Sequence, residues 1–259
     1  MSLEMKTLSL PDLNGADTKR LAQARRHIHN GALWLARMAN CYRPPEADSA
    51  QMRLRWLDQS RSLSTQTFNN NLTLQLRLPQ LHLQFMENGN PMPHVFDMED
   101  RTPAEAEAWI LVELLHRGLE RERFTKTLPF EIAALMTGDT DTYAPVEYES
   151  ELAKLTDWLA GGAAVLKRLS QSSEGLWLAP EQLQFSVVTS SADKPARTGF
   201  SLGDERMSEP NFFVVPQKIG TAQSLRPNAV LTASQVHKGA MSPDAIVAYL
   251  KDAAQKQSA

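Results

Sequence analysis

An alternation of apolar and polar residues from Leu72 to Leu78 is the feature that most constrains the fold of this chain. Leucine occupies every second position of the segment LTLQLRL, with threonine, glutamine and arginine between. Because successive side chains of a strand point to opposite faces, the pattern predicts a strand with one buried and one wetted face. The alternation resumes from Leu81 to Phe85, so we expect an antiparallel meander that also includes strands near 52–57 and 94–97.

Helical patterns lie on both sides of this meander. Residues 17–41 carry an apolar seam at spacings of three and four, formed by Leu21, Ala24, Ile28, Gly31, Leu35 and Met38. The Asn30-Gly31 pair interrupts this segment, so two helices with a break there are the alternative. A second helix starts at the capping box Thr102-Pro103-Ala104-Glu105. We expect it to bury Ala108, Leu111, Val112, Leu115 and Leu119.

The same order of elements recurs in the second half of the chain. A helix is expected over 148–169, strands at 175–178, 183–188, 198–202 and 211–215, and a last helix after Ser242-Pro243. The predicted fold class is therefore α+β, with antiparallel β-meanders packed against about four main helices. The order suggests two similar helix–meander–helix halves, 15–125 and 146–256. Gly31 and Gly162 share the fourth seam position, and we expect the two helices to cross there.

Composition predicts one compact unit spanning residues 1–259. The chain is 42% hydrophobic and 22% charged, as is usual for globular proteins, and its apolar runs are too short to cross a membrane. No basic segment with a following apolar stretch opens the chain, so secretion by that route is not expected. Cys41 is the single cysteine, which excludes an internal disulfide and a multi-thiolate metal site. We therefore expect a cytoplasmic protein without membrane contact.

The net charge of −3 conceals an asymmetry along the chain. Residues 1–61 carry ten Lys/Arg and six Asp/Glu, a net +4, whereas residues 87–157 carry six and sixteen, a net −10. This pattern is typical of two solvated faces of opposite sign, and it is also compatible with self-association or a basic partner surface. The basic part is thin and the whole chain is acidic, so a nucleic-acid partner is not expected.

The sequence contains no strong catalytic or cofactor motif. Walker, dinucleotide-binding, G-x-S-x-G, H-E-x-x-H and C-x-x-C patterns are all missing, so no catalytic residue, cofactor or metal site is predicted. Two segments could line a ligand pocket: PMPHVFD, with an enclosed histidine, and the acidic stretch GDERMSE. Each segment also has a structural interpretation. A lone histidine among prolines and apolar residues is more often structural, and the acidic residues are typical of the tip of a hairpin. The candidate pocket residues are His94, Asp97, Asp204, Glu205 and Glu209.

Several short pieces stand in a characteristic order and spacing, most of them in the C-terminal half: NGALWLARM, LPFE, YAPVEYESELAKLTDWLAGGAAVLKRL, APEQLQFSVV and GFSLGDERMSEPNFFVVP. In this order and spacing they resemble a group of uncharacterised bacterial proteins classed only as a domain of unknown function. The chain lacks the His-Trp-Trp run of the first sheet in that group. The resemblance implies no activity and no catalytic residues.

Two functions are compatible with these observations. The first is a ligand-binding or interaction protein without catalysis, with a small molecule or a protein as its partner. The second is a small-molecule hydrolase or isomerase that uses carboxylates and His94 in a cleft between the halves. The sequence alone does not decide whether the chain is an enzyme. Convergence of the candidate residues on one concave surface would favour the second.

Overall fold

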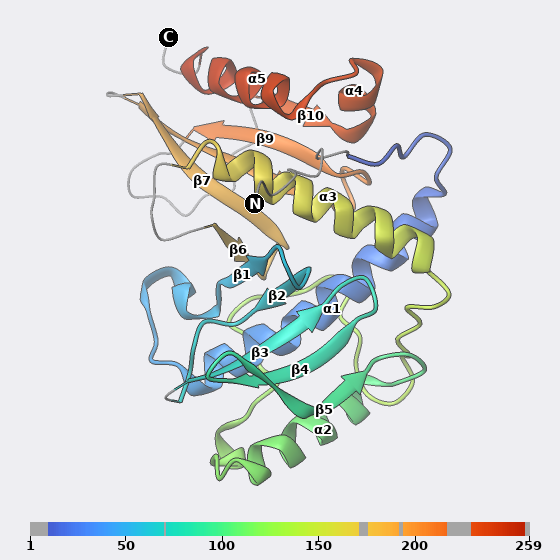
Figure 1. Cartoon of the computed structure of the whole chain (residues 1–259), viewed down its shortest axis with the longest axis vertical. Coiled ribbons are helices and arrows are strands. Elements are labelled where there is room, and N and C mark those ends of the chain that lie inside the picture. Colours follow the sequence, from blue (N-terminus) through green and yellow to red (C-terminus); the bar gives the residue numbers. More distant parts are fainter. Residues whose placement is uncertain (1–9, 70, 171–175, 192–193, 217–228, 257–259) are drawn as a thin grey trace, which may run out of the picture. The chain divides into compact units, whose positions relative to one another are not determined.

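The computed structural model describes residues 10–69, 71–170, 176–191, 194–216 and 229–256 (Figure 1). The chain divides into two compact units. The N-terminal unit comprises Lys19–Ala153 and Trp177–Leu183, and the C-terminal unit comprises Met1–Thr18, Lys154–Leu176 and Gln184–Ala259. Both combine antiparallel strands with helices, which confirms the predicted α+β class. The duplication of residues 15–125 as 146–256 stays a prediction.

The described part of the N-terminal unit contains six strands in the order β6-β1-β2-β3-β4-β5, with antiparallel neighbours. Leu74 and Leu76 of β3 pair with Phe85 and Leu83 of β4, so the predicted alternation places apolar side chains on one shared face. Strand β2 is too short to give a periodic signal and was not predicted. The strands are β1 (Leu54–Leu57), β2 (Ser62–Ser64), β3 (Leu72–Arg77), β4 (His82–Glu87), β5 (Asn90–Asp97) and β6 (Trp177–Ala179).

Two long helices, α1 (Thr18–Tyr42) and α2 (Pro103–His116), pack on the apolar face of this sheet. Helix α1 is continuous, so the alternative of a break at Asn30-Gly31 is wrong. Tertiary contacts of Asn30 explain why the helix continues. Its buried side-chain amide nitrogen donates to the carbonyls of Arg26 and Ala134, and its side-chain oxygen accepts from the backbone N–H of Met136. Short 3-10 helices, η1 (Ala47–Met52) and η2 (Arg121–Arg123), complete the unit.

Helix α2 begins at the predicted capping box, in which Thr102 and Glu105 bond each other's backbone N–H groups. The predicted buried face of this helix is wrong. Val112 and Leu115 are exposed, and the buried positions are instead Pro103, Ala106, Ile110, Glu113 and Leu114. Because the helix is apolar around most of its circumference, its sequence pattern does not select one inward face.

Among its described residues, the C-terminal unit contains four antiparallel strands in the order β10-β9-β8-β7. Helix α3 lies against them, and its Trp158 ring stacks parallel to Phe200 of β8 at a centroid distance of 6.4 Å. The elements are α3 (Glu149–Lys167), whose first residues belong to the N-terminal unit, β7 (Gln184–Ser191), β8 (Lys194–Ser201), β9 (Asn211–Pro216), β10 (Ala229–Thr232), α4 (Ala233–Lys238) and α5 (Pro243–Lys256). The sequence did not predict β10 or α4.

The two seam glycines each allow a helix to approach a strand of its own unit. A Cβ added at Gly31 would lie 2.9 Å from a methyl carbon of Leu76, and one at Gly162 would lie 2.4 Å from ring carbons of Phe200. The predicted close approach at each glycine is therefore confirmed, but the group that approaches the glycine is not the one that was predicted. A sheet side chain, rather than a crossing helix, takes the space at each position.

Substituting Gly162 by alanine should destabilise the protein more than substituting Gly31. The rigid, buried ring of Phe200 cannot yield to a new methyl group, and overpacking of this kind costs about 1–3 kcal/mol. At Gly31 the neighbour is the end of a flexible leucine, and alanine regains about 1 kcal/mol of helix propensity. Urea unfolding of G162A and G31A measures both free energies. Equal losses would contradict this explanation.

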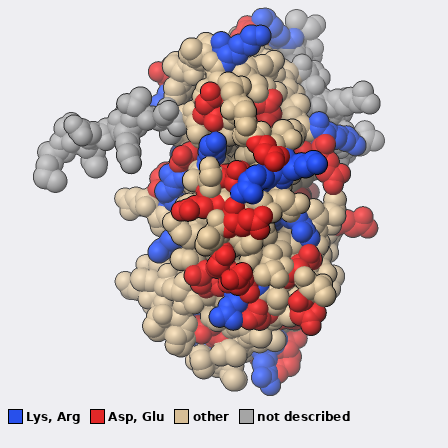
Figure 2. All heavy atoms as spheres, turned by 90° about the vertical axis from the view of Figure 1, so that its right-hand side faces the viewer, with Lys and Arg blue, Asp and Glu red and all other residues tan. Residues whose placement is uncertain are grey.

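The opposite charges of the two sequence segments partly neutralise each other within the N-terminal unit. Arg20 pairs with Glu151 at 3.1 Å, and Arg26 pairs with Asp141 at 3.2 Å. Acidic and basic side chains are interspersed over the face drawn in Figure 2. The asymmetry along the sequence is thus reduced by folding. Among the described residues, no helix is both long and apolar enough to cross a membrane.

A buried histidine on α1 should make stability depend on acid pH. His27 packs against the rings of Tyr143 and Tyr148, and its Nδ1 has no hydrogen-bond partner among the described residues. Burial disfavours the charged imidazole and lowers the pKa of His27 from 6.5 to about 4. Between these values the unfolded chain binds more protons, so the free energy of unfolding falls as pH decreases from 6.5 to about 4.

The variant His27→Phe keeps a ring but cannot be protonated, so its stability should fall less steeply over this pH range. The full shift corresponds to about 3 kcal/mol. Urea unfolding at pH 7, 5.5 and 4 compares the two proteins. Parallel pH profiles would show that His27 is not the titrating group.

Candidate functional site

A glutamate faces inward on α2, and the candidate site is built around it. Glu113 follows Ala106 and Ile110 on the buried side of the helix and exposes only 2% of its side chain. An ionised carboxylate loses its hydration when buried, so it needs a cation and hydrogen bonds as compensation. The surrounding residues supply both.

Arg117, one helical turn later, compensates the charge of Glu113. Its Nη1 lies 2.6 Å from Glu113 Oε2 and also donates to the Glu113 backbone carbonyl at 2.7 Å. The arginine side chain is itself 9% exposed, and its guanidinium carbon lies 4.5 Å from the centroid of the Phe85 ring. The pair is therefore held between α2 and β4, with Oε2 occupied.

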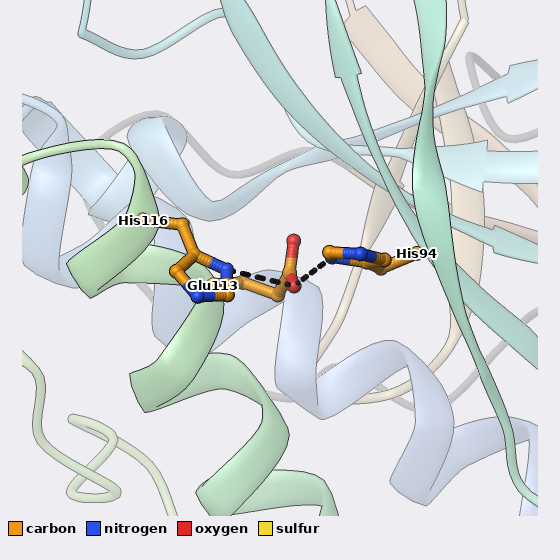
Figure 3. A group of neighbouring side chains, drawn as sticks. All are labelled: His94, Glu113 and His116. Atoms are coloured by element: carbon orange, nitrogen blue, oxygen red, sulfur yellow. Dashed lines mark hydrogen bonds and ion pairs between the residues drawn. The ribbon is translucent and has the colours of Figure 1, made fainter.

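The second oxygen of Glu113 faces two histidines (Figure 3). His94 Nδ1 lies 2.8 Å from Oε1, and His116 Nδ1 lies 3.7 Å from the same oxygen. The two imidazole centroids are 5.9 Å apart. Unlike the glutamate, the histidines are 59% and 54% exposed, so they form the solvent side of the cluster.

Strand β5 directs His94 toward α2. Pairing of β4 with β5 shifts between Gln84 and Met86, and beyond this irregularity Phe96 is buried on the apolar face. The ring of Phe96 packs against the ring of Trp109 of α2, with a distance of 5.6 Å between the two ring centroids. His94 comes two residues before Phe96 and therefore lies on the same side of the strand. The aromatic contact thus sets the separation between the strand and the helix that carries Glu113.

The structure does not bring His94 and Asp97 together. They are three residues apart on β5 and therefore lie on opposite faces of the strand. Asp97 instead forms an ion pair with His82 at 3.5 Å and accepts a hydrogen bond from the Glu99 backbone. That opposite face has a hollow lined by Gln75, Arg77, His82, Gln84 and Val95.

The acidic candidates Asp204, Glu205 and Glu209 lie in the C-terminal unit, between β8 and β9. Asp204 Oδ1 accepts from the backbone N–H groups of Arg206 and Met207. Glu209 Oε2 accepts from the backbone and hydroxyl of Ser234, in the first turn of α4, and Glu205 is exposed. These contacts give two of the acids a structural role. A pocket that combines these acids with either His94 or Asp97 stays a prediction.

Of the clustered residues, the sequence singled out only His94 as a pocket candidate. Glu113, His116 and Arg117 follow the pattern E-x-x-H-R, which places all three on one side of a helix. This spacing is the sequence signal from which the Glu113–His116–Arg117 group could have been predicted. It was missed because the apolar positions of α2 were assigned to the wrong face, which put Glu113 in solvent.

Comparisons with protein-family models, with curated proteins and with solved structures find no match to this chain. The resemblance to the bacterial group therefore stays a prediction.

The substitution Glu113→Gln should strongly destabilise the protein, because it leaves the buried Arg117 without a counter-ion. Breaking a buried pair in this way costs about 3–5 kcal/mol. Glu107→Gln, on the same helix, is the matched control: it removes the more exposed pair with Lys126 and should cost under about 1 kcal/mol. Urea unfolding measures both variants.

The double variant Glu113→Gln/Arg117→Met should recover part of the loss, because it removes the uncompensated cation as well. A double variant less stable than Glu113→Gln would contradict this account of the pair.

Proposed function

We propose that this chain is a cytoplasmic ligand-binding protein whose site is the His94–Glu113–His116 cluster. The observation that carries the proposal is the convergence of two exposed imidazoles on one buried carboxylate oxygen. If Glu113 had only a structural role, Arg117 alone would be enough to compensate its charge. The two histidines add further polar groups on the side of the carboxylate that faces the solvent. The single cysteine supports a reducing compartment.

The exposure of the histidines favours binding over catalysis. Electrostatic stabilisation of a transition state works best where water is excluded. His94 and His116 are each more than half exposed, so water reaches the imidazoles. Such a site suits reversible capture of a ligand by imidazole nitrogens and a carboxylate oxygen.

A thermal-shift screen of the full-length protein against divalent metal ions, oxyanions and common metabolites tests the proposal. A ligand present at 100 times its Kd should add about 2.7 kcal/mol of stability. The shift should decrease in His94→Ala and His116→Ala, which alter exposed side chains. His82→Ala is the matched control, because that histidine also faces a carboxylate, Asp97, but on the other face of the sheet. Ligand shifts that are equal in all variants would refute the proposed site.

A small-molecule hydrolase or isomerase is the second candidate, and the 2.8 Å contact between His94 Nδ1 and Glu113 Oε1 favours it. A carboxylate at this distance orients an imidazole for general-base work. Turnover of ester, amide or isomerisable sugar substrates that is abolished by His94→Ala would establish catalysis. Ligand binding without turnover would establish the first function instead.

A further inference from the structure

We infer that His94, Glu113 and His116 form a binding site for a divalent first-row transition-metal ion, of which zinc is the typical example. This inference rests on the proposed function, because it names the ligand of the same cluster. It departs from the sequence expectation of no metal site. Among the described residues, these three bring one donor atom each to within 4.8 Å of one another.

Two of the three distances between donor atoms are close to those around a tetrahedral ion, and side-chain rotation of the exposed histidines would bring their nitrogens, which lie within 4.8 Å of each other, to the third. Ligand atoms about 2.0–2.2 Å from a tetrahedral zinc ion lie roughly 3.3–3.6 Å apart. The two nitrogen-to-Oε1 distances, 2.8 Å for His94 and 3.7 Å for His116, lie on either side of this value. The shorter distance is a hydrogen bond, so metal binding requires the neutral His94 to carry its proton on Nε2 and to offer Nδ1 as the ligand.

The three ligands are carried by regular secondary structure, two by helix α2 and one by strand β5. Glu113 and His116 have the i, i+3 spacing of the Glu-x-x-His motif, by which one helix presents a carboxylate and an imidazole to the same ion. His94 approaches from β5, opposite the helix, as Figure 3 shows. The α2 pair and the strand ligand therefore face each other across the space where the ion would lie.

Arg117 would position the glutamate without contacting the ion itself, because it binds the oxygen of Glu113 that faces away from the histidines. By holding Oε2 at 2.6 Å it leaves Oε1 as the ligand and fixes the orientation of the carboxylate. Its positive charge opposes cation binding, and the two neutral imidazoles must outweigh this effect. Hard ions such as Mg²⁺ and Ca²⁺ prefer all-oxygen ligands, whereas imidazole suits zinc, cobalt, nickel and copper. The site is therefore expected to discriminate against magnesium and calcium.

Three protein ligands leave one tetrahedral position open. Because His94 and His116 are more than half exposed, that position is accessible to water or to a small anion. Structural zinc sites are closed by four protein ligands, whereas sites with three exchange a solvent molecule. The geometry thus points to exchangeable metal rather than to an ion required for folding.

Calorimetric titration of the chelator-treated full-length protein with ZnCl₂ tests the inference. We expect one equivalent to bind, and we expect the affinity to fall at least about tenfold in His94→Ala and in His116→Ala. His82→Ala should bind as the wild type does. Titration with CoCl₂ should produce the visible absorption bands of four-coordinate cobalt, and excess MgCl₂ should not displace the ion. These variants alter exposed side chains and leave the Glu113–Arg117 pair intact.

Absence of stoichiometric zinc and cobalt binding, or equal affinity in the wild type and both histidine variants, would overturn the metal inference. The proposed function would survive this result if the thermal-shift screen still identified a non-metal ligand whose effect depends on His94 and His116. If no ligand of any class depended on these histidines, the metal inference and the proposed function would both fail.

Discussion

The buried charge of Glu113 is the constraint on which the N-terminal unit and its candidate site depend. A carboxylate that is 2% exposed is tolerated only with a partner, and Arg117 supplies that partner while it packs over Phe85. This arrangement sets the rotation of α2 about its axis. Ile110 and Leu114 turn inward with the glutamate, and Val112 and Leu115 turn outward. His116 is then carried to the edge of the helix, beside the open carboxylate oxygen.

The other half of the cluster depends on the sheet. His94 lies two residues before Phe96 on β5 and on the same side of the strand, and Trp109 packs beside Phe85 and Phe96. Apolar packing therefore determines how far β5 lies from α2, and the 2.8 Å contact of His94 with Glu113 follows from it. Residues held by a helix and a strand keep their geometry better than residues on loops do, which favours specific ligand binding at this cluster.

Much of the fold could be predicted because its signals are local. Alternating leucines indicated β3, and the reciprocal contacts of Thr102 with Glu105 confirm the expected start of α2. Errors arose where distant residues decide the outcome. Asn30 does not break α1, because its amide bonds to Ala134 and Met136, which are more than a hundred positions away. The site was predicted only through His94, since Asp97 lies on the opposite face and the acids at 204–209 mainly serve their own turn and α4.

The sequence by itself determined the fold class, the positions of most helices and strands, and the presence of a buried face on the meander. These features depend on residue periodicity and capping, which neighbouring positions encode. Only the tertiary structure decided which face of the largely apolar α2 points inward, and hence which residues meet at the site. That choice depends on the contact of α2 with the aromatic residues of β4 and β5 and on the pairing of a buried charge. Neither appears in the local pattern of α2.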